Sequence, residues 1–159
     1  MIEPTNGYRY RLERSLGRAS ASLLWVMFNP STADDLVDDP TIRRCIGFAK
    51  AAGYGRMSVV NLFAARATRP ARLLEIDDPV GPDNDDVIKA EIRRATTVAF
   101  AFGATRLAGL DVDQRWKTVD QMCLSRGIIP KCLGMTKDGW PRHPLYVPST
   151  QRLVEWEML

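Results

Sequence analysis

The stretch SLLWVMFNPST, residues 22 to 32, is a continuous apolar run that stops at an amide followed by proline. Apolar runs of this length, rich in β-branched and aromatic residues, are typical of strands buried on both faces of a sheet. Proline at 30 fixes its own φ at about −65° and favours an extended conformation at Asn29. We therefore expect the Asn29 amide to project from the end of a buried strand with little conformational freedom.

Three further apolar runs have the same character and are bounded by glycine, proline or polar residues. They are RMSVVNLF (56 to 63), TTVAFAFG (96 to 103) and GIIPKCLG (127 to 134). The segments between the four runs, 41–52, 84–95 and 112–123, have apolar residues at helical spacing on one face and are predicted to be amphipathic helices. Buried strands that alternate with helices predict a parallel sheet joined by right-handed crossovers.

The N-terminal segment YRYRLER, residues 8 to 14, alternates apolar residues with charged ones. This pattern predicts an added edge strand that is exposed on one side. The predicted fold is α/β, a three-layer α/β/α sandwich with a central, mainly parallel sheet of about four strands plus this N-terminal edge strand. Residues 1–159 show no internal repeat or low-complexity linker and are expected to form one domain.

Composition favours an ordinary globular protein, with 45% hydrophobic and 26% charged residues. The N-terminus has no apolar signal segment and no run of about 18 apolar residues occurs, so we expect a cytoplasmic protein without a membrane span. Three widely spaced cysteines suggest reduced core thiols rather than a zinc or iron–sulfur site. We expect no cofactor and no metal, and the oligomeric state is left open.

The formal net charge of +3 is unevenly distributed. Five cations and a single acid, Asp138, lie between residues 126 and 152; the cations are Arg126, Lys131, Lys137, Arg142 and Arg152. Such a segment would attract an anionic ligand. Residues 77–86 hold five aspartates and no cation, and should face away from a polyanion. A solvated surface would account for either segment equally well.

Polar residues follow the predicted strands at the edge where open parallel sheets bind ligands. Asn29 and Ser31 follow the first strand, Asn61 ends the second, and the chain's one histidine, His143, lies in the loop after the fourth. Pro144 restrains His143 as Pro30 restrains Asn29, which favours a preorganised site. Each residue also has a structural alternative: a local turn for Asn29, a buried backbone partner for Asn61 and a surface loop for His143.

Four aspartates follow the NPST turn, namely Asp34, Asp35, Asp38 and Asp39. Asp39 before Pro40 has the pattern of a helix N-cap with proline at the first helical position. The other three exceed what a cap needs, so one of them is a candidate general base or metal ligand. A metal-assisted phosphoesterase is one alternative, although no second acidic motif or further histidine completes a two-metal site.

The motifs together resemble a known family. NPSTADDLVDDPTIRRCIGFAKAAGYG, VVNLFAARAT, FAFG and GWPRHPLY closely resemble the bacterial family called domain of unknown function 1643, over nearly the whole chain. More distantly, FNPS, VVNLF, AFG and HPLY resemble, in that order, the strand-end motifs of the uracil-DNA glycosylase superfamily. Met27, Ser31 and Leu145 depart from those motifs, and the lost glycines predict a reshaped or occluded pocket.

The glycosylase resemblance implies roles for individual residues. Asn29 would position the attacking water, Asn61 would read the base edge, and His143 would donate a hydrogen bond to the departing base. A base flipped out of a duplex would stack on Phe63 or Trp140 near Ser31. Phosphates of the nucleic-acid backbone would meet three cations: Arg142, Arg152 and Lys137.

The sequence thus leads to a hypothesis and two alternatives. The hypothesis is a glycosylase-like protein that binds a nucleobase, nucleotide or nucleic acid and hydrolyses an N-glycosidic bond, with Asp34 or Asp35 as the candidate base. The first alternative is a non-catalytic nucleic-acid-binding module on the same fold, with salt-dependent binding. The second is the metal-assisted phosphoesterase. The sequence leaves open whether the protein is an enzyme at all.

Overall fold

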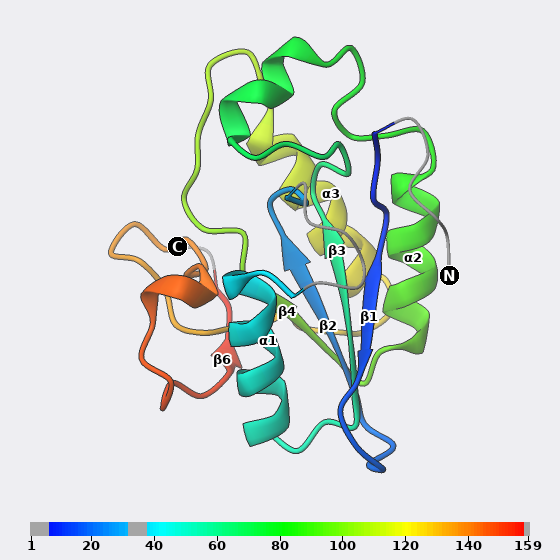
Figure 1. The fold of residues 1–159 in the computed structure, drawn as a ribbon, viewed down its shortest axis with the longest axis vertical. Helices are drawn as coiled ribbons and strands as arrows, with labels where there is room; N and C mark the ends of the chain where they lie inside the picture. The colour runs from blue at the N-terminus through cyan, green and yellow to red at the C-terminus, as the bar shows by residue number, and fades with distance from the viewer. Residues whose placement is uncertain (1–6, 32–37, 158–159) are drawn as a thin grey trace.

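A mixed six-stranded sheet forms the centre of the computed structural model, which describes residues 7–31 and 38–157 (Figure 1). The strand order is β1-β3-β2-β4-β5-β6. The strands are β1 (Leu12–Ser15), β2 (Ser22–Met27), β3 (Arg56–Asn61), β4 (Thr97–Phe100), β5 (Lys131–Cys132) and β6 (Val154–Glu155). The four inner strands run parallel, whereas β1 and β6 pair antiparallel at the two edges. The carboxyl ends of β2, β3, β4 and β5 therefore lie at the same edge of the sheet.

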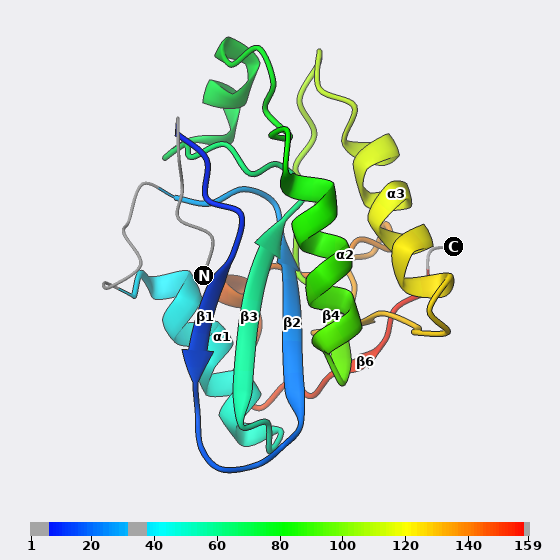
Figure 2. The same cartoon turned by 90° about the vertical axis from the view of Figure 1, so that its right-hand side faces the viewer.

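Helices cover both faces of the sheet, with α1 (Pro40–Ala51) on one face and α2 (Asn84–Arg94) and α3 (Val112–Leu124) on the other (Figures 1 and 2). Successive side chains of β2 alternate between the two cores, because neighbouring residues of a strand point to opposite faces. Leu24 and Val26 pack in the core under α2 and α3, while Leu23 and Trp25 pack under α1. This double burial explains the continuous apolar run from which the fold was predicted.

Helix α1 begins where its sequence predicted. The Asp39 side chain accepts a hydrogen bond from the Ile42 backbone N–H at 2.8 Å, and Pro40 occupies the first turn. The N-cap prediction for Asp39 is therefore confirmed. At the start of α2, by contrast, the Asp83 side chain makes no capping bond. The side chain of Asn84 instead donates to the backbone at the end of β3.

The structure confirms a mixed α/β protein and corrects details of the predicted sheet. The fourth strand is two residues long, since Pro130 cannot donate a ladder hydrogen bond and Gly134 turns the chain at φ 86°. Strand β6 was not predicted. The N-terminal edge strand begins only at Leu12, and the segment before it is not exposed on one side: Arg9 is 4% exposed and Tyr10 2%.

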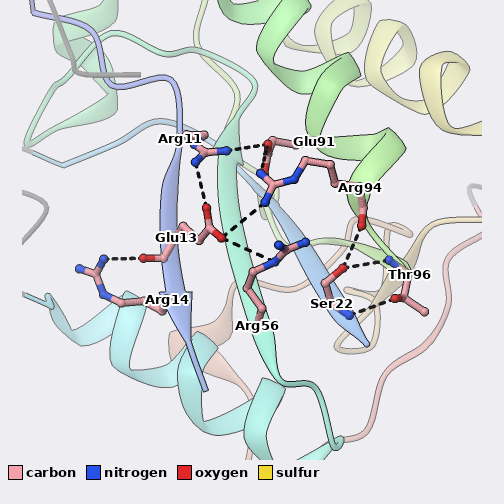
Figure 3. A network of polar contacts seen from close by, with 8 residues as sticks. All are labelled: Arg11, Glu13, Arg14, Ser22, Arg56, Glu91, Arg94 and Thr96. Carbon is pink, nitrogen blue, oxygen red and sulfur yellow. Dashed lines mark hydrogen bonds and ion pairs between the residues drawn. The ribbon is translucent and has the colours of Figure 1, made fainter. Parts of the chain in front are cut away.

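An ion-pair network ties β1 to α2 along the side of the sheet (Figure 3). Arg11 lies 2.9 Å from the carboxylates of both Glu13 and Glu91, and Arg94 lies 3.0 Å from Glu91. Glu13 lies opposite Ser58 in the middle of β3, so the network runs along the side of the sheet between β1 and α2 and braces the two elements against each other.

Two 3-10 helices, η1 (Pro70–Glu75) and η2 (Pro144–Tyr146), lie in the loops that follow β3 and β5. The three cysteines are buried and form no disulfide. In the part of the chain that the structure describes, no helix is both long enough and apolar enough to cross a bilayer.

Candidate functional site

A cavity of about 620 Å³ opens at the carboxyl ends of β2, β3 and β4. Its size lies within the range of about 300–1,000 Å³ that is usual for small-molecule sites. The polar residues predicted to meet at this edge do so: Asn29, Ser31, Asn61 and His143 all line it, together with Arg142, which was predicted as a phosphate contact. Parallel pairing explains this convergence, because Met27 of β2 lies opposite Asn61 of β3. Met27 lines the cavity without filling it.

The Asn29 amide is fixed by two backbone carbonyls. Its Nδ2 donates to the carbonyl of Pro30 at 3.0 Å and to that of Ala67 at 2.9 Å. Carbonyl oxygens only accept hydrogen bonds, so the amide NH₂ must face them. The structural alternative considered for Asn29, a local turn held by its side chain, is thus present. These hydrogen bonds use only the NH₂ group and leave Oδ1 as an acceptor at the cavity.

Asn61 presents a buried amide to the cavity. The residue is only 3% exposed, and its side chain has no hydrogen bond to the described residues. Behind it, Nδ2 of the fully buried Asn84 donates to the carbonyls of Asn61 and Leu62, and Arg115 also donates to Leu62. Buried polar groups normally have partners, so an unbonded amide at a cavity wall is available to a ligand.

The His143 imidazole is held in one tautomer. Its Nδ1 accepts a hydrogen bond from the Leu145 backbone N–H at 3.2 Å, which places the proton of the neutral ring on Nε2. Burial lowers the pKa of His143 below 6.5, and the opposing effect of Asp39 is smaller. At neutral pH the ring is therefore uncharged and offers an Nε2–H donor.

Arg44 of α1 anchors the loop that carries His143. Its guanidinium donates to the Pro144 carbonyl at 3.1 Å and also to the Val147 carbonyl. Pro144 is the first residue of η2, the 3-10 turn that His143 caps, and Val147 follows its last residue. The position of His143 thus depends on α1, which is set in turn by its Asp39 cap.

The acids that the structure describes near the cavity are already engaged. Ser31 Oγ donates to Asp39 Oδ2 at 2.9 Å, while Oδ1 of the same carboxylate caps α1. Asp38 pairs with Arg14 at 2.8 Å. The two candidate general bases, Asp34 and Asp35, lie outside the described residues. Within residues 7–31 and 38–157, no three His, Cys, Asp or Glu side chains are grouped to hold a metal ion.

Four residues predicted to contact a ligand do not line this cavity. The Phe63 ring is 1% exposed and packs on Phe28 in the core, and Trp140 packs against Trp116 beneath Arg106. Core packing leaves the Phe63 ring no face for a ligand, so its predicted stacking role is wrong here. Trp140 is half-buried and lies outside the lining of this cavity, and its predicted role stays a prediction. Lys137 is exposed elsewhere, and Arg152 lines a separate cavity beside Phe48.

Sequence reasoning missed Arg9 and two arginines that flank lining residues. Arg9 lines the cavity although its position in YRYRLER suggested exposure. Arg66 and Arg69 lie in the loop after β3, whose Thr68 and Pro70 line the same cavity. The signal that was available is the RATRP segment, which places two cations just beyond the carboxyl end of a buried strand.

These features define a class: a mixed α/β protein with a cavity at the carboxyl ends of parallel strands that is lined by apolar and polar residues, including Arg9 and Arg142. The family model described as "Protein of unknown function (DUF1643)" matches residues 9–145, and the chain belongs to this family. The match spans Arg9, Asn29, Asn61 and His143. No curated protein and no solved structure matches the chain.

Proposed function

We propose that this cavity binds a nucleobase carried on a nucleotide or nucleic acid, and that the protein hydrolyses the N-glycosidic bond of that ligand. The observation that carries the proposal is the fixed Nε2–H tautomer of a neutral His143 that shares a cavity with the unbonded Asn61 amide. The ordered motifs that resemble the uracil-DNA glycosylase superfamily support it. Helices on both faces of the sheet also fit the three-layer sandwich that this resemblance implies.

In the proposed reaction, water attacks the anomeric carbon and the bond from that carbon to the base nitrogen breaks. The bonding electrons leave with the base, so negative charge develops on the base as the bond opens. His143 Nε2–H donates a hydrogen bond to that charge, and a donor fixed before the reaction needs no reorganisation. A neutral imidazole is suited to this role because it stabilises the anion without needing to transfer its proton.

The two asparagines take complementary parts in the proposal. Asn29 Oδ1 accepts a hydrogen from the attacking water and so orients a lone pair toward the sugar; its NH₂ is committed to backbone carbonyls. Asn61 has both a donor and an acceptor to offer, which suits the adjacent donor and acceptor groups of a base edge. Asp34 or Asp35 is proposed as the base that removes the proton from water.

The test compares two near-isosteric variants of His143. In His143→Asn, the side-chain oxygen replaces Nδ1 as acceptor for Leu145 and the Nε2–H donor is lost. In His143→Gln, the longer amide keeps a donor at the Nε2 position and loses the Nδ1 acceptor. Both are assayed with the wild type on labelled single- and double-stranded DNA containing uracil, hypoxanthine or mismatches, and on free nucleosides and nucleotides. Binding and base release are scored separately.

We expect base release by the wild type, a loss of about 10²-fold or more in His143→Asn, and partial retention in His143→Gln. Release that is undiminished in His143→Asn would refute the assigned role. Binding without release by the wild type would refute hydrolysis and favour a non-catalytic binding module. Release that disappears on chelation would instead support a metal-assisted reaction.

A further inference from the structure

Two arginines, one buried and one exposed, line the cavity described above. Arg9 lines it and is only 4% exposed, and Arg142 lines it from the loop before η2. Asp39 is the one carboxylate among the described lining residues, and its oxygens are engaged by Ser31 and by the first turn of α1. The electrostatic potential in this space therefore favours an anion.

Arg9 lines the cavity and also interacts within the chain. A guanidinium carries five N–H donors in a planar fork, and this geometry matches the oxygens of phosphate. Next to the cavity, Arg66 has a buried Nε without a hydrogen-bond partner among the described residues. Arg66 lies two residues before the lining residue Thr68.

The distribution of cations distinguishes a small ligand from a polymer. The phosphates of a bound strand run across a protein surface, where exposed cations follow them. Of the three exposed cations expected to do so, Arg142 lines this cavity, whereas Lys137 and Arg152 do not. A phosphate that meets the buried Arg9 must instead lie inside the cavity, together with the group that meets the buried Asn61.

We infer that the ligand is a free nucleoside monophosphate: its phosphate binds Arg9 and Arg142, and its base meets Asn61 and His143. This inference rests on the proposed function and narrows its substrate from nucleic acid to a mononucleotide. The cavity of about 620 Å³ is of a size that encloses a whole small ligand.

The test is calorimetric titration of the full chain at one ionic strength. The probes are the 5′-monophosphates of uridine, cytidine, adenosine, guanosine and inosine, the five parent nucleosides, and a short single-stranded oligonucleotide of each base. We expect one monophosphate to bind at least about tenfold more tightly than its nucleoside and than its oligonucleotide. That ligand should also shift the imidazole resonances of His143, which as the single histidine reports binding at this cavity.

Three variants assign the phosphate contacts. Arg9→Met and Arg142→Met should each remove most of the preference for the monophosphate over the nucleoside. Lys137→Met removes the same charge from an exposed residue that does not line the cavity and should leave the preference unchanged. Circular dichroism checks folding, and Arg142→Met carries the test if the buried Arg9 proves necessary for stability.

The outcomes separate this inference from the proposed function. Equal binding of nucleoside and monophosphate would overturn the inference, as would a monophosphate preference that both arginine variants keep. Base release from DNA with no affinity for mononucleotides would overturn the inference and leave the proposed function standing. No binding of any nucleoside, nucleotide or oligonucleotide would overturn both.

Discussion

The buried amide of Asn84 offers a quantitative test of how the site is positioned. Its Nδ2 donates to the Asn61 carbonyl at 3.0 Å and to the Leu62 carbonyl at 3.3 Å. Arg115 also donates to Leu62 at 2.9 Å, so Asn84→Ala removes the side-chain donor mainly from Asn61. A buried acceptor left without its partner costs about 1–3 kcal/mol. Loss of the buried Asn84 Oδ1, which has no partner among the described residues, offsets part of this.

We therefore expect Asn84→Ala to lower the free energy of unfolding by about 2 kcal/mol. Asn84→Asp has nearly the same volume but replaces the donor with an acceptor that faces two carbonyls, so it should destabilise the protein more than Asn84→Ala does. Urea unfolding measures both effects, and about 2 kcal/mol corresponds to a midpoint shift of roughly 1 M.

Asp83→Ala is a matched control, because the neighbouring Asp83 is exposed and its side chain makes no capping bond. Its effect should stay within about 0.5 kcal/mol. Asn84→Asp with wild-type stability would refute the argument that the Asn84 donor anchors the end of β3. If the anchor matters for the site, Asn84→Ala should also weaken binding of any ligand that contacts Asn61.

Four other expectations follow from single contacts. Burial lowers the pKa of His143, so as the pH falls the unfolded chain takes up a proton at a higher pH than the folded protein does. The free energy of unfolding should therefore fall as pH drops below about 6.5 and stop falling below the folded pKa of His143. A histidine NMR titration and unfolding at several pH values measure this, and His143→Gln should abolish that part of the pH dependence. Asp39→Ala should lower stability by about 0.5–2 kcal/mol in thermal unfolding, whereas Asp39→Asn should retain most of it because asparagine also caps helices. Arg44→Ala should free the Pro144–Val147 turn, so that ¹⁵N spectra show both His143 tautomers; a single Nε2–H tautomer in that variant would contradict the anchoring role. The thiols of Cys45, Cys123 and Cys132 should resist a disulfide reagent until the protein unfolds, because all three are buried and burial raises their pKa values, that of Cys123 to about 12. Reaction of any of the three in the native protein would contradict this.

The long, strongly patterned elements could be predicted from the sequence because each satisfies a local rule. SLLWVMF is buried on both faces, and α1 has its cap, its first-turn proline and an apolar stripe of correct period. Strand β6 could not be predicted in this way. Val154 and Glu155 are exposed and pair with a two-residue strand, so their conformation depends on contacts with distant Pro130 and Lys131.

Residues of the candidate site could be predicted where local backbone geometry positions the side chain. They could not be predicted where packing between distant segments positions it. Asn29, Asn61 and His143 were found because strand ends and Xaa-Pro units can be read locally. Arg9 was missed because its alternation suggested an exposed strand. The segment instead pairs antiparallel with the chain that follows β3, through the Tyr8–Ala65 bridge and a 2.9 Å hydrogen bond from the Arg9 N–H to the Ala64 carbonyl. Phe63 was assigned to the ligand for the converse reason, since aromatic residues of a core and of a binding site look alike in sequence.

The geometry at Asn29 and Pro30 explains why a buried strand ends there on an amide. The Pro30 carbonyl accepts the Asn29 side chain at 3.0 Å and the Ala67 backbone N–H at 3.1 Å, and the Ala67 carbonyl accepts the same Asn29 side chain at 2.9 Å. The turn after β2 and the loop after β3 are thereby joined through one side chain. Any residue that filled this place without an amide would leave two carbonyls with fewer donors at the cavity edge, so Asn29 secures the wall of the site as well as contributing its Oδ1 to it.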